Sequence, residues 1–313
     1  MPALNVSRSI SIAQPVKSVR KNLTDFRQWP AWSPWLCQER DAHISFHGDS
    51  GEIGSSYAWE GKRVGAGEMQ LRAKSDKRID YELTFLKPWK SRAKVAFELE
   101  AQGKSHSKAE TRVTWSMQSS LPFFLFFMRK SFENFVGMDY DRGLRMLKEQ
   151  LESGKISSRI DLADDVRALP GCYYIGQEGS STLAEMAAVM GEAYVSLNQQ
   201  VVDQGLEADG PAFCHYTRMD MMRDRWVYTM GIPVKATEAT HGIAKRDDVS
   251  KCAYVEHTGS YMHLGNAWAT VFGAIRARQQ KHDRRSGGFE IYRQAPSDET
   301  AGDAITDIYL PLK

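Results

Sequence analysis

The stretch GGFEIYRQAPSDETAGDAITDIYLPL, residues 287–312, decides how the second half of the chain folds. Side chains alternate between the two faces of a strand, so a strand over residues 288–293 places Glu290 and Tyr292 on one face and their apolar neighbours on the other. Turn-forming residues follow, and residues 305–312 return as a second strand. The sequence therefore predicts a hairpin in which a single carboxylate lies among aromatic side chains.

A similar hairpin occurs earlier, in PAFCHYTRMDMMRDRWVYTMGIPV, residues 211–234. Upstream, YIGQEG at 174–179 matches YVEHTG at 254–259, and a helical segment follows each match. The second half therefore reads as strand, helix, strand, strand, written twice. A cleft is expected on the pseudo-twofold axis, and only one copy supplies an acid to it. The hairpins align Phe213 with Phe289, Cys214 with Glu290, Tyr216 with Tyr292 and Pro233 with Pro311.

Two repeats of this kind, ending in FEIY and DIYLPL, resemble the GyrI-like effector-binding domain, which is also the ligand-sensing half of AraC-type and MerR-type regulators. The resemblance covers residues 166–313. It implies that Glu290 is the central acid with which such domains meet cationic or polarised ligands. Those regulators place a DNA-binding helix-turn-helix before the sensing domain, and this sequence has something else there.

Aromatic side chains close to this acid are candidates for lining its cleft, because ligand pockets are mostly apolar with a few polar groups. Two of them alternate on one face of the strand RWVYTM, and a third lies in a helical segment over residues 261–280. Packing in the core is the alternative for each of them, and for the cysteine of the first repeat. The candidate ligand-binding residues are Glu290, Tyr292, Trp226, Tyr228, Trp268 and Cys214.

The first half opens with an alternating strand over residues 5–12 and a helix that begins at Pro15. WPAWSPW, residues 29–35, interleaves tryptophan with proline, so we expect an ordered aromatic loop rather than a helix. Short alternating runs between residues 43 and 117 predict an antiparallel meander. Apolar residues with helical spacing over residues 121–151 predict a long closing helix.

These elements form a helix-grip arrangement, in which a curved antiparallel sheet surrounds a long helix, and the fold class of the whole chain is α+β. The pieces GEIGSSYAWEGKRVGAGEMQL, TRVTWSM and DYDRGLRMLKEQLESG resemble the SRPBCC superfamily of polyketide cyclase and START-like proteins. That resemblance covers residues 4–153 and implies a deep apolar cavity, but it fixes no catalytic residue. The polar stretch ESGKISSRIDLADD suits an exposed linker. We expect an SRPBCC-like domain at 1–153, a linker at 154–165 and a GyrI-like domain at 166–313.

Composition limits the other functions. The formal net charge is only +2 and no run of five or more basic residues occurs, so we expect no nucleic-acid partner. The cysteines and histidines show no metal-ligand spacing, and no glycine-rich nucleotide motif is present, so we expect neither a metal nor a cofactor.

The sequence gives no sign of a membrane or export signal. The N-terminal residues lack a signal-peptide pattern, and no apolar run is long enough to span a bilayer, so a cytoplasmic protein without membrane insertion is expected. LPFFLFFM, residues 121–128, either touches a membrane or packs against the sheet, and we expect the latter.

The leading hypothesis is a cytoplasmic protein that binds or sequesters small hydrophobic or aromatic, partly cationic compounds. Two alternatives stay open. One is a hydrolase of reactive electrophilic xenobiotics, in which Glu290 would be the general base. The other is a protein-binding module like the gyrase-inhibitor relatives, in which an exposed acidic and aromatic surface contacts a partner. A deep pocket around Glu290 favours a ligand or catalysis, and a shallow groove favours a protein partner.

Overall fold

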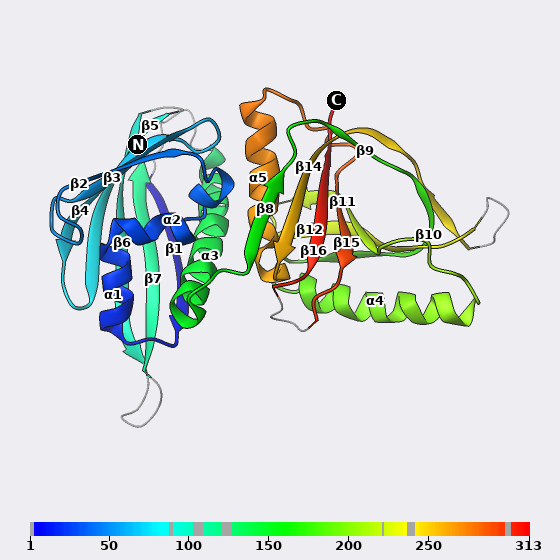
Figure 1. The fold of residues 1–313 in the computed structure, drawn as a ribbon, viewed down its shortest axis with the longest axis horizontal. Coiled ribbons are helices and arrows are strands. Elements are labelled where there is room, and N and C mark those ends of the chain that lie inside the picture. The colour runs from blue at the N-terminus through cyan, green and yellow to red at the C-terminus, as the bar shows by residue number, and fades with distance from the viewer. Residues whose placement is uncertain are drawn as a thin grey trace. The chain divides into compact units, whose positions relative to one another are not determined.

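The computed structural model describes residues 3–87, 90–102, 109–120, 127–220, 222–236, 242–297 and 302–313. The chain divides into two compact units, Met1–Ile156 and Ser157–Lys313. Each unit combines an antiparallel sheet with helices (Figure 1), so the predicted α+β class is confirmed.

The first unit is an antiparallel sheet accompanied by a long helix. Its described strands follow the order β1-β7-β6-β5-β4-β3-β2, so each strand from β2 to β6 pairs with the next along the chain, as the meander predicts, and β1 pairs with β7. The elements are β1 (Ala3–Ile12), α1 (Val16–Thr24), α2 (Trp29–Trp32), β2 (His43–His47), β3 (Ser56–Gly61), β4 (Gly65–Lys74), β5 (Arg78–Lys87), β6 (Ser91–Gln102), β7 (Glu110–Ser120) and α3 (Arg129–Ser153), with short 3₁₀ turns at Phe26–Gln28 and Leu36–Gln38.

Aromatic side chains fill the space between this sheet and α3. Trp115 of β7 stacks on Tyr140 of α3 with ring centroids 3.8 Å apart, and Phe97 of β6 stacks on the same indole at 5.0 Å. Trp29 and Trp32 complete the cluster and are almost fully buried. Such ring pairs contribute about 0.5–1.5 kcal/mol each beyond their buried area. These side chains occupy the space where the SRPBCC resemblance implies a cavity.

The tryptophan and proline segment was predicted to be a loop, and this prediction was wrong for its first four residues. Trp29–Trp32 form the helical turn α2, which tolerates Pro30 because amides in the first turn of a helix have no acceptor within the helix. The turn ends at Ser33, where the backbone becomes extended before Pro34, as a residue preceding proline prefers.

The start of α3 differs from its prediction. The helix begins at Arg129 rather than near residue 121, and residues 121–126 lie outside the described part. Phe127 is 67% exposed and Met128 is 37% exposed, so the end of LPFFLFFM is not buried against the sheet as expected.

The second unit contains the predicted duplication. β10-α4-β11-β12 and β14-α5-β15-β16 are the two copies, and the described sheet runs β13-β10-β12-β11-β15-β16-β14-β8, with β9 paired to β14. The elements are β8 (Ser158–Leu162), β9 (Arg167–Leu169), β10 (Cys172–Ser181), α4 (Met186–Asp203), β11 (Phe213–Asp220), β12 (Arg225–Pro233), β13 (Ala244–Arg246), β14 (Val249–Gly259), α5 (Leu264–Ala277), β15 (Gly288–Gln294) and β16 (Ile305–Pro311), with a 3₁₀ turn at Tyr261–His263.

The two repeats meet along β11 and β15, whose register places the pseudo-twofold axis. Cys214 pairs directly with Glu290, its own counterpart in the alignment, and Phe213 pairs with Ile291. A residue that faces its counterpart in this way lies beside the axis. The outer strands are matched less closely: Tyr174 pairs with Pro233, but Cys252 rather than Tyr254 pairs with Pro311. This shift of two residues leaves every side chain on its face, because strands alternate with period 2.

Part of the predicted linker is a strand. Ser158–Leu162 form β8, which pairs antiparallel with β14 at the edge of the second sheet. Ile160 and Leu162 of this strand pack against the core that α5 forms with β14 and β16. Within residues 154–165, the connection outside secondary structure is therefore shorter than expected.

The short strands β9 and β13 each pair with a strand of the other repeat. Each precedes the first long strand of its own repeat and pairs with that of the other repeat, β9 with β14 and β13 with β10. Both strands carry an arginine, Arg167 and Arg246, whose guanidinium lies over aromatic rings of the sheet.

Candidate functional site

Glu290 lies in the middle strand pair of the second sheet and is buried. Its exposed fraction is 3%, and its neighbours Phe289 and Ile291 point to the opposite face, as the alternation predicts. The face of Glu290 is the one covered by α4 and α5, since Trp268 of α5 reaches its carboxylate and Tyr194 of α4 packs against Tyr292.

Three side chains donate hydrogen bonds to the Glu290 carboxylate. The indole Nε1 of Trp268 donates to Oε1 at 2.6 Å. The hydroxyl groups of Tyr216 and Tyr292 donate to Oε2 at 3.0 Å and 2.7 Å. These donors come from α5, β11 and β15, so both repeats hold the acid. Trp268 and Tyr292, two of the candidates named from the sequence, therefore contact Glu290 directly.

Burial raises the pKa of Glu290, while the bonds from Trp268, Tyr292 and Tyr216 act in the opposite direction. All three donors are neutral, and among the described residues no lysine or arginine forms an ion pair with this carboxylate. A buried carboxylate without a cation is costly, and hydrogen bonds offset only part of that cost. The site is therefore arranged to gain from an incoming positive charge.

Cys214 lies beside Glu290 on the same face of the sheet, as its direct cross-strand partner. Burial raises the pKa of its thiol, and the charge of Glu290 adds to this effect. The two residues are neighbours on either side of the pseudo-twofold axis, because the strands that carry them are paired.

Trp226 and Tyr228 are buried one layer away from the acid. Their rings contact the ring of Tyr216, with centroids 6.3 Å and 6.0 Å away. Their polar groups bind elsewhere: Trp226 Nε1 donates to Asp224 at 3.1 Å, and the Tyr228 hydroxyl donates to Ser181 at 3.0 Å. Both residues therefore support Tyr216 and do not bond to Glu290.

Three tyrosines of this site, Tyr216, Tyr194 and Tyr261, were not among the candidates predicted from the sequence. Tyr216 could have been found, because it aligns with Tyr292. Tyr194 donates to the Phe213 carbonyl at 2.7 Å, and its ring lies 5.9 Å from that of Tyr292. Tyr261 is 39% exposed, and its ring lies 5.6 Å from that of Tyr292. These last two belong to a helix and a 3₁₀ turn, where nothing in the sequence shows which strand they meet.

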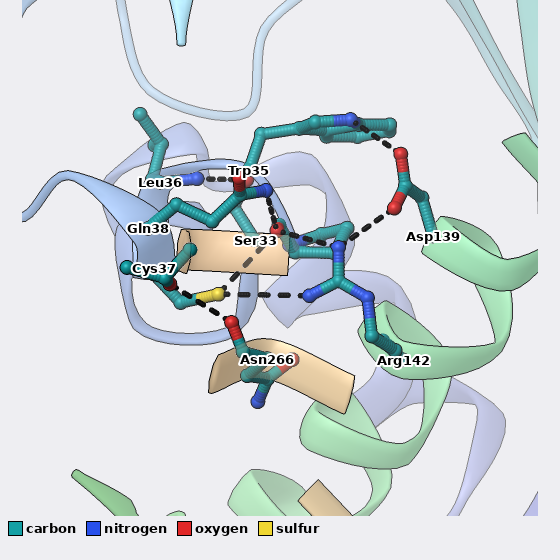
Figure 2. A network of polar contacts seen from close by, with 10 residues as sticks. Ser33, Trp35, Leu36, Cys37, Gln38, Asp139, Arg142 and Asn266 are labelled. Atoms are coloured by element: carbon teal, nitrogen blue, oxygen red, sulfur yellow. Dashed lines mark hydrogen bonds and ion pairs between the residues drawn. The ribbon is translucent and has the colours of Figure 1, made fainter. Parts of the chain in front are cut away.

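A polar cluster in the first unit ties α3 to the tryptophan segment (Figure 2). Arg142 is buried and donates from Nη2 to Asp139 at 2.7 Å and to the Pro34 carbonyl at 3.1 Å. Trp35 Nε1 donates to the other oxygen of Asp139 at 3.0 Å. Cys37 lies close by, and its Sγ is 4.0 Å from Nη1 of Arg142. The charge of this arginine is paired, which is the usual condition for a buried ion.

Within the described ranges, no cluster of three or more His, Cys, Asp or Glu side chains is suited to a metal ion. No helix of the described part is long and apolar enough to cross a membrane.

Family models match both units. Residues 3–152 match the family described as polyketide cyclase / dehydrase and lipid transport, and residues 165–313 match the GyrI-like small molecule binding domain. A search of the curated proteins gave no match.

Among solved structures, the chain is similar to the Aha1 dimer of Colwellia psychrerythraea, with 17% identity over 49% of this chain and 99% of that chain and a TM-score of 0.36. It is also similar to EcmrR in its DNA complex, with 14% identity over 60% of this chain and 69% of that one and a TM-score of 0.40. The chain thus consists of an N-terminal SRPBCC domain of the polyketide cyclase type and a C-terminal GyrI-like small molecule binding domain.

Proposed function

We propose that the second unit binds small hydrophobic or aromatic cations at Glu290. The observation that carries this proposal is a buried carboxylate bonded to three neutral donors, with no ion-pair partner among the described residues. A cation that reached Glu290 would supply the missing charge, and the surrounding rings would contact its apolar groups. Cation–π contacts contribute about 0.5–2 kcal/mol, with the larger values in desolvated sites.

Access to the acid runs through aromatic side chains that are not fully buried. Trp268, Tyr292 and Tyr194 are partly exposed, and Tyr261 is exposed. Because two of them also donate to Glu290, an incoming ligand has to displace donors as well as rings. Binding therefore involves movement of aromatic side chains next to α4 and α5, and the carboxylate is covered until they move.

We assign the ligand to the second unit rather than the first, because aromatic side chains occupy the interior of the first. The buried position of Glu290 also gives no support to a protein-binding surface centred on this acid. An exposed acid would suit that alternative better.

Calorimetric titration with the lipophilic cation tetraphenylphosphonium tests the proposal on the full chain. Glu290→Gln should weaken binding by about 1–3 kcal/mol, since one charge-assisted contact is lost. Glu256→Gln is the matched control, because Glu256 lies in the same unit, outside the contacts of Glu290, and pairs with Arg293. Neutral triphenylphosphine oxide should bind wild type and Glu290→Gln alike. Equal affinity of the cation for wild type and Glu290→Gln would remove Glu290 from the site.

A hydrolase is the second candidate, favoured by the direction of the pKa shift of Glu290, because burial raises the pKa of this carboxyl and a higher pKa makes a carboxylate a stronger general base. In this role Glu290 would take a proton from water, and Tyr216 or Tyr292 would be displaced from it. Hydrolysis of a panel of epoxides and activated esters, abolished by Glu290→Gln and retained by Glu256→Gln, would establish catalysis. Loss of cation binding without any turnover in wild type would leave binding alone as the function.

A further inference from the structure

A second hollow lies near β13 in the second unit, away from the acid. Its volume is about 1140 Å³, and its lining includes Cys172, Lys245, Arg246 and Asp248. Arg246 stacks over the rings of Phe213 and Phe289, with its Cζ 4.5 Å and 5.7 Å from the centroids. Phe289 directly precedes Glu290, so Arg246 contacts the face of the sheet opposite to that acid.

The guanidinium of Arg246 has unused donors. Its Nη2 donates to the Pro170 carbonyl at 2.8 Å, but Nε and Nη1 are buried and have no acceptor among the described residues. An arginine carries five N–H donors and keeps its charge, so leaving two of its nitrogens buried without acceptors is unfavourable. A water or a ligand oxygen that reached these nitrogens would relieve this cost.

Three acids, Asp209, Asp247 and Asp248, line the hollow together with the basic residues Lys235, Lys245 and Arg246. Asp248 accepts the Gly171 amide at 2.6 Å, and no ion pair joins Arg246 to a carboxylate in the described ranges. Burial lowers the pKa of Arg246, and the groups that oppose this effect are Cys172, Tyr174 and Tyr309 rather than any aspartate or glutamate.

Two other arginines of the chain, unlike Arg246, are paired with carboxylates. Arg142 in the first unit is buried and bonded to Asp139. Arg293, on the same sheet face as Phe289, pairs with Glu256 and Asp307. Arg246 is partly buried, rests on apolar rings, lines the hollow and forms no ion pair with a carboxylate in the described ranges.

We propose that Arg246 anchors a small ligand through an oxyanion, a carboxylate or a phosphate, bound in the hollow beside β13. Charge-assisted bonds from a guanidinium to these groups are stronger than neutral ones. The site is independent of Glu290, because the two side chains lie on opposite faces of the sheet.

Calorimetric titration of the full chain with inorganic phosphate and with succinate, at low ionic strength, tests the site. Arg246→Gln should weaken binding of the preferred anion at least tenfold. Arg167→Gln should leave it unchanged, since Arg167 is the exposed arginine of β9, stacks on Tyr254 and does not line the hollow. Glu290→Gln should also leave it unchanged. The tighter of the two anions identifies the head group. Equal binding by wild type and Arg246→Gln, or no binding of either anion at millimolar concentration, would overturn the proposal.

Chemical modification of the unaltered chain covers the case in which Arg246→Gln does not fold. Phenylglyoxal modifies guanidinium groups, and mass spectrometry locates the adducts. A saturating concentration of the bound anion should slow modification of Arg246 at least fivefold and leave that of Arg167 unchanged. Equal rates at Arg246 with and without the anion would overturn the assignment.

Discussion

Trp268→Phe tests whether Glu290 is charged and dependent on its donors. The substitution keeps an aromatic ring and removes the Nε1 donor that lies 2.6 Å from Oε1. A hydrogen bond to a charged group contributes about 1.5–3 kcal/mol, so the second unit should lose about that much stability at neutral pH, plus a packing loss. The carboxylate would keep Tyr216 and Tyr292 as donors.

The matched control is Trp226→Phe, because the indole of Trp226 contacts the ring of Tyr216, as that of Trp268 does, but donates to the exposed Asp224 at 3.1 Å. Its packing loss is comparable, and the lost bond should contribute about 0.5–1.5 kcal/mol at most. In a Glu290→Gln background, the stability lost on Trp268→Phe should also fall to about that smaller value, since the acceptor is then a neutral amide.

Hydrogen exchange of the full chain, followed by mass spectrometry in peptides that contain β11 and β15, measures these free energies in the second unit alone. The double-mutant cycle between Trp268 and Glu290 should give a coupling of about 1 kcal/mol or more. Equal costs for Trp268→Phe and Trp226→Phe, or a Trp268→Phe cost that Glu290→Gln leaves unchanged, would refute the reasoning.

Three further outcomes are expected. Burial and the neighbouring His263 lower the pKa of His257 from 6.5 to about 4. The folded state then binds fewer protons, so stability should fall by about 3 kcal/mol as the pH drops through this range. His257→Gln should remove that loss in acid unfolding followed by circular dichroism, and an unchanged loss would assign it to other groups. Limited proteolysis should cut first within residues 153–166 and release two stable halves, which a first cut well inside 60–140 would contradict. A small thiol reagent should modify Cys172 before the buried Cys214, and bound tetraphenylphosphonium should slow Cys214 further. If a ligand that requires Glu290 for binding leaves the modification rate of Cys214 unchanged, the two residues do not share a binding site.

Alternation and repetition were enough to predict the centre of the second unit. A period-2 pattern placed Glu290 and Tyr292 on one face, and the alignment of two hairpins made Cys214 the counterpart of the acid. Strand pairing then had little freedom, because a slip of one residue would turn the apolar face outward.

Other features depended on contacts that a linear pattern does not contain. The partners of Tyr194 and of Arg246 are set by how a helix and a short exchanged strand pack on the sheet. The strand β8 had a signal that was missed, since Ile160 and Leu162 alternate within a polar stretch. The helical turn at Trp29 was missed because a proline in the first turn does not break a helix.

The direct pairing of Cys214 with Glu290 explains why the duplicated domain cannot be symmetric in its chemistry. Opposed residues on paired strands have Cβ atoms about 4.5–5.5 Å apart. If both repeats supplied an acid at this position, two buried carboxyl groups would meet there, and one of them would have to keep its proton. The duplication thus produced two copies of one strand, but only one of the two paired positions can hold an ionised carboxylate. The small uncharged thiol of Cys214 at the other position allows Glu290 to be that carboxylate.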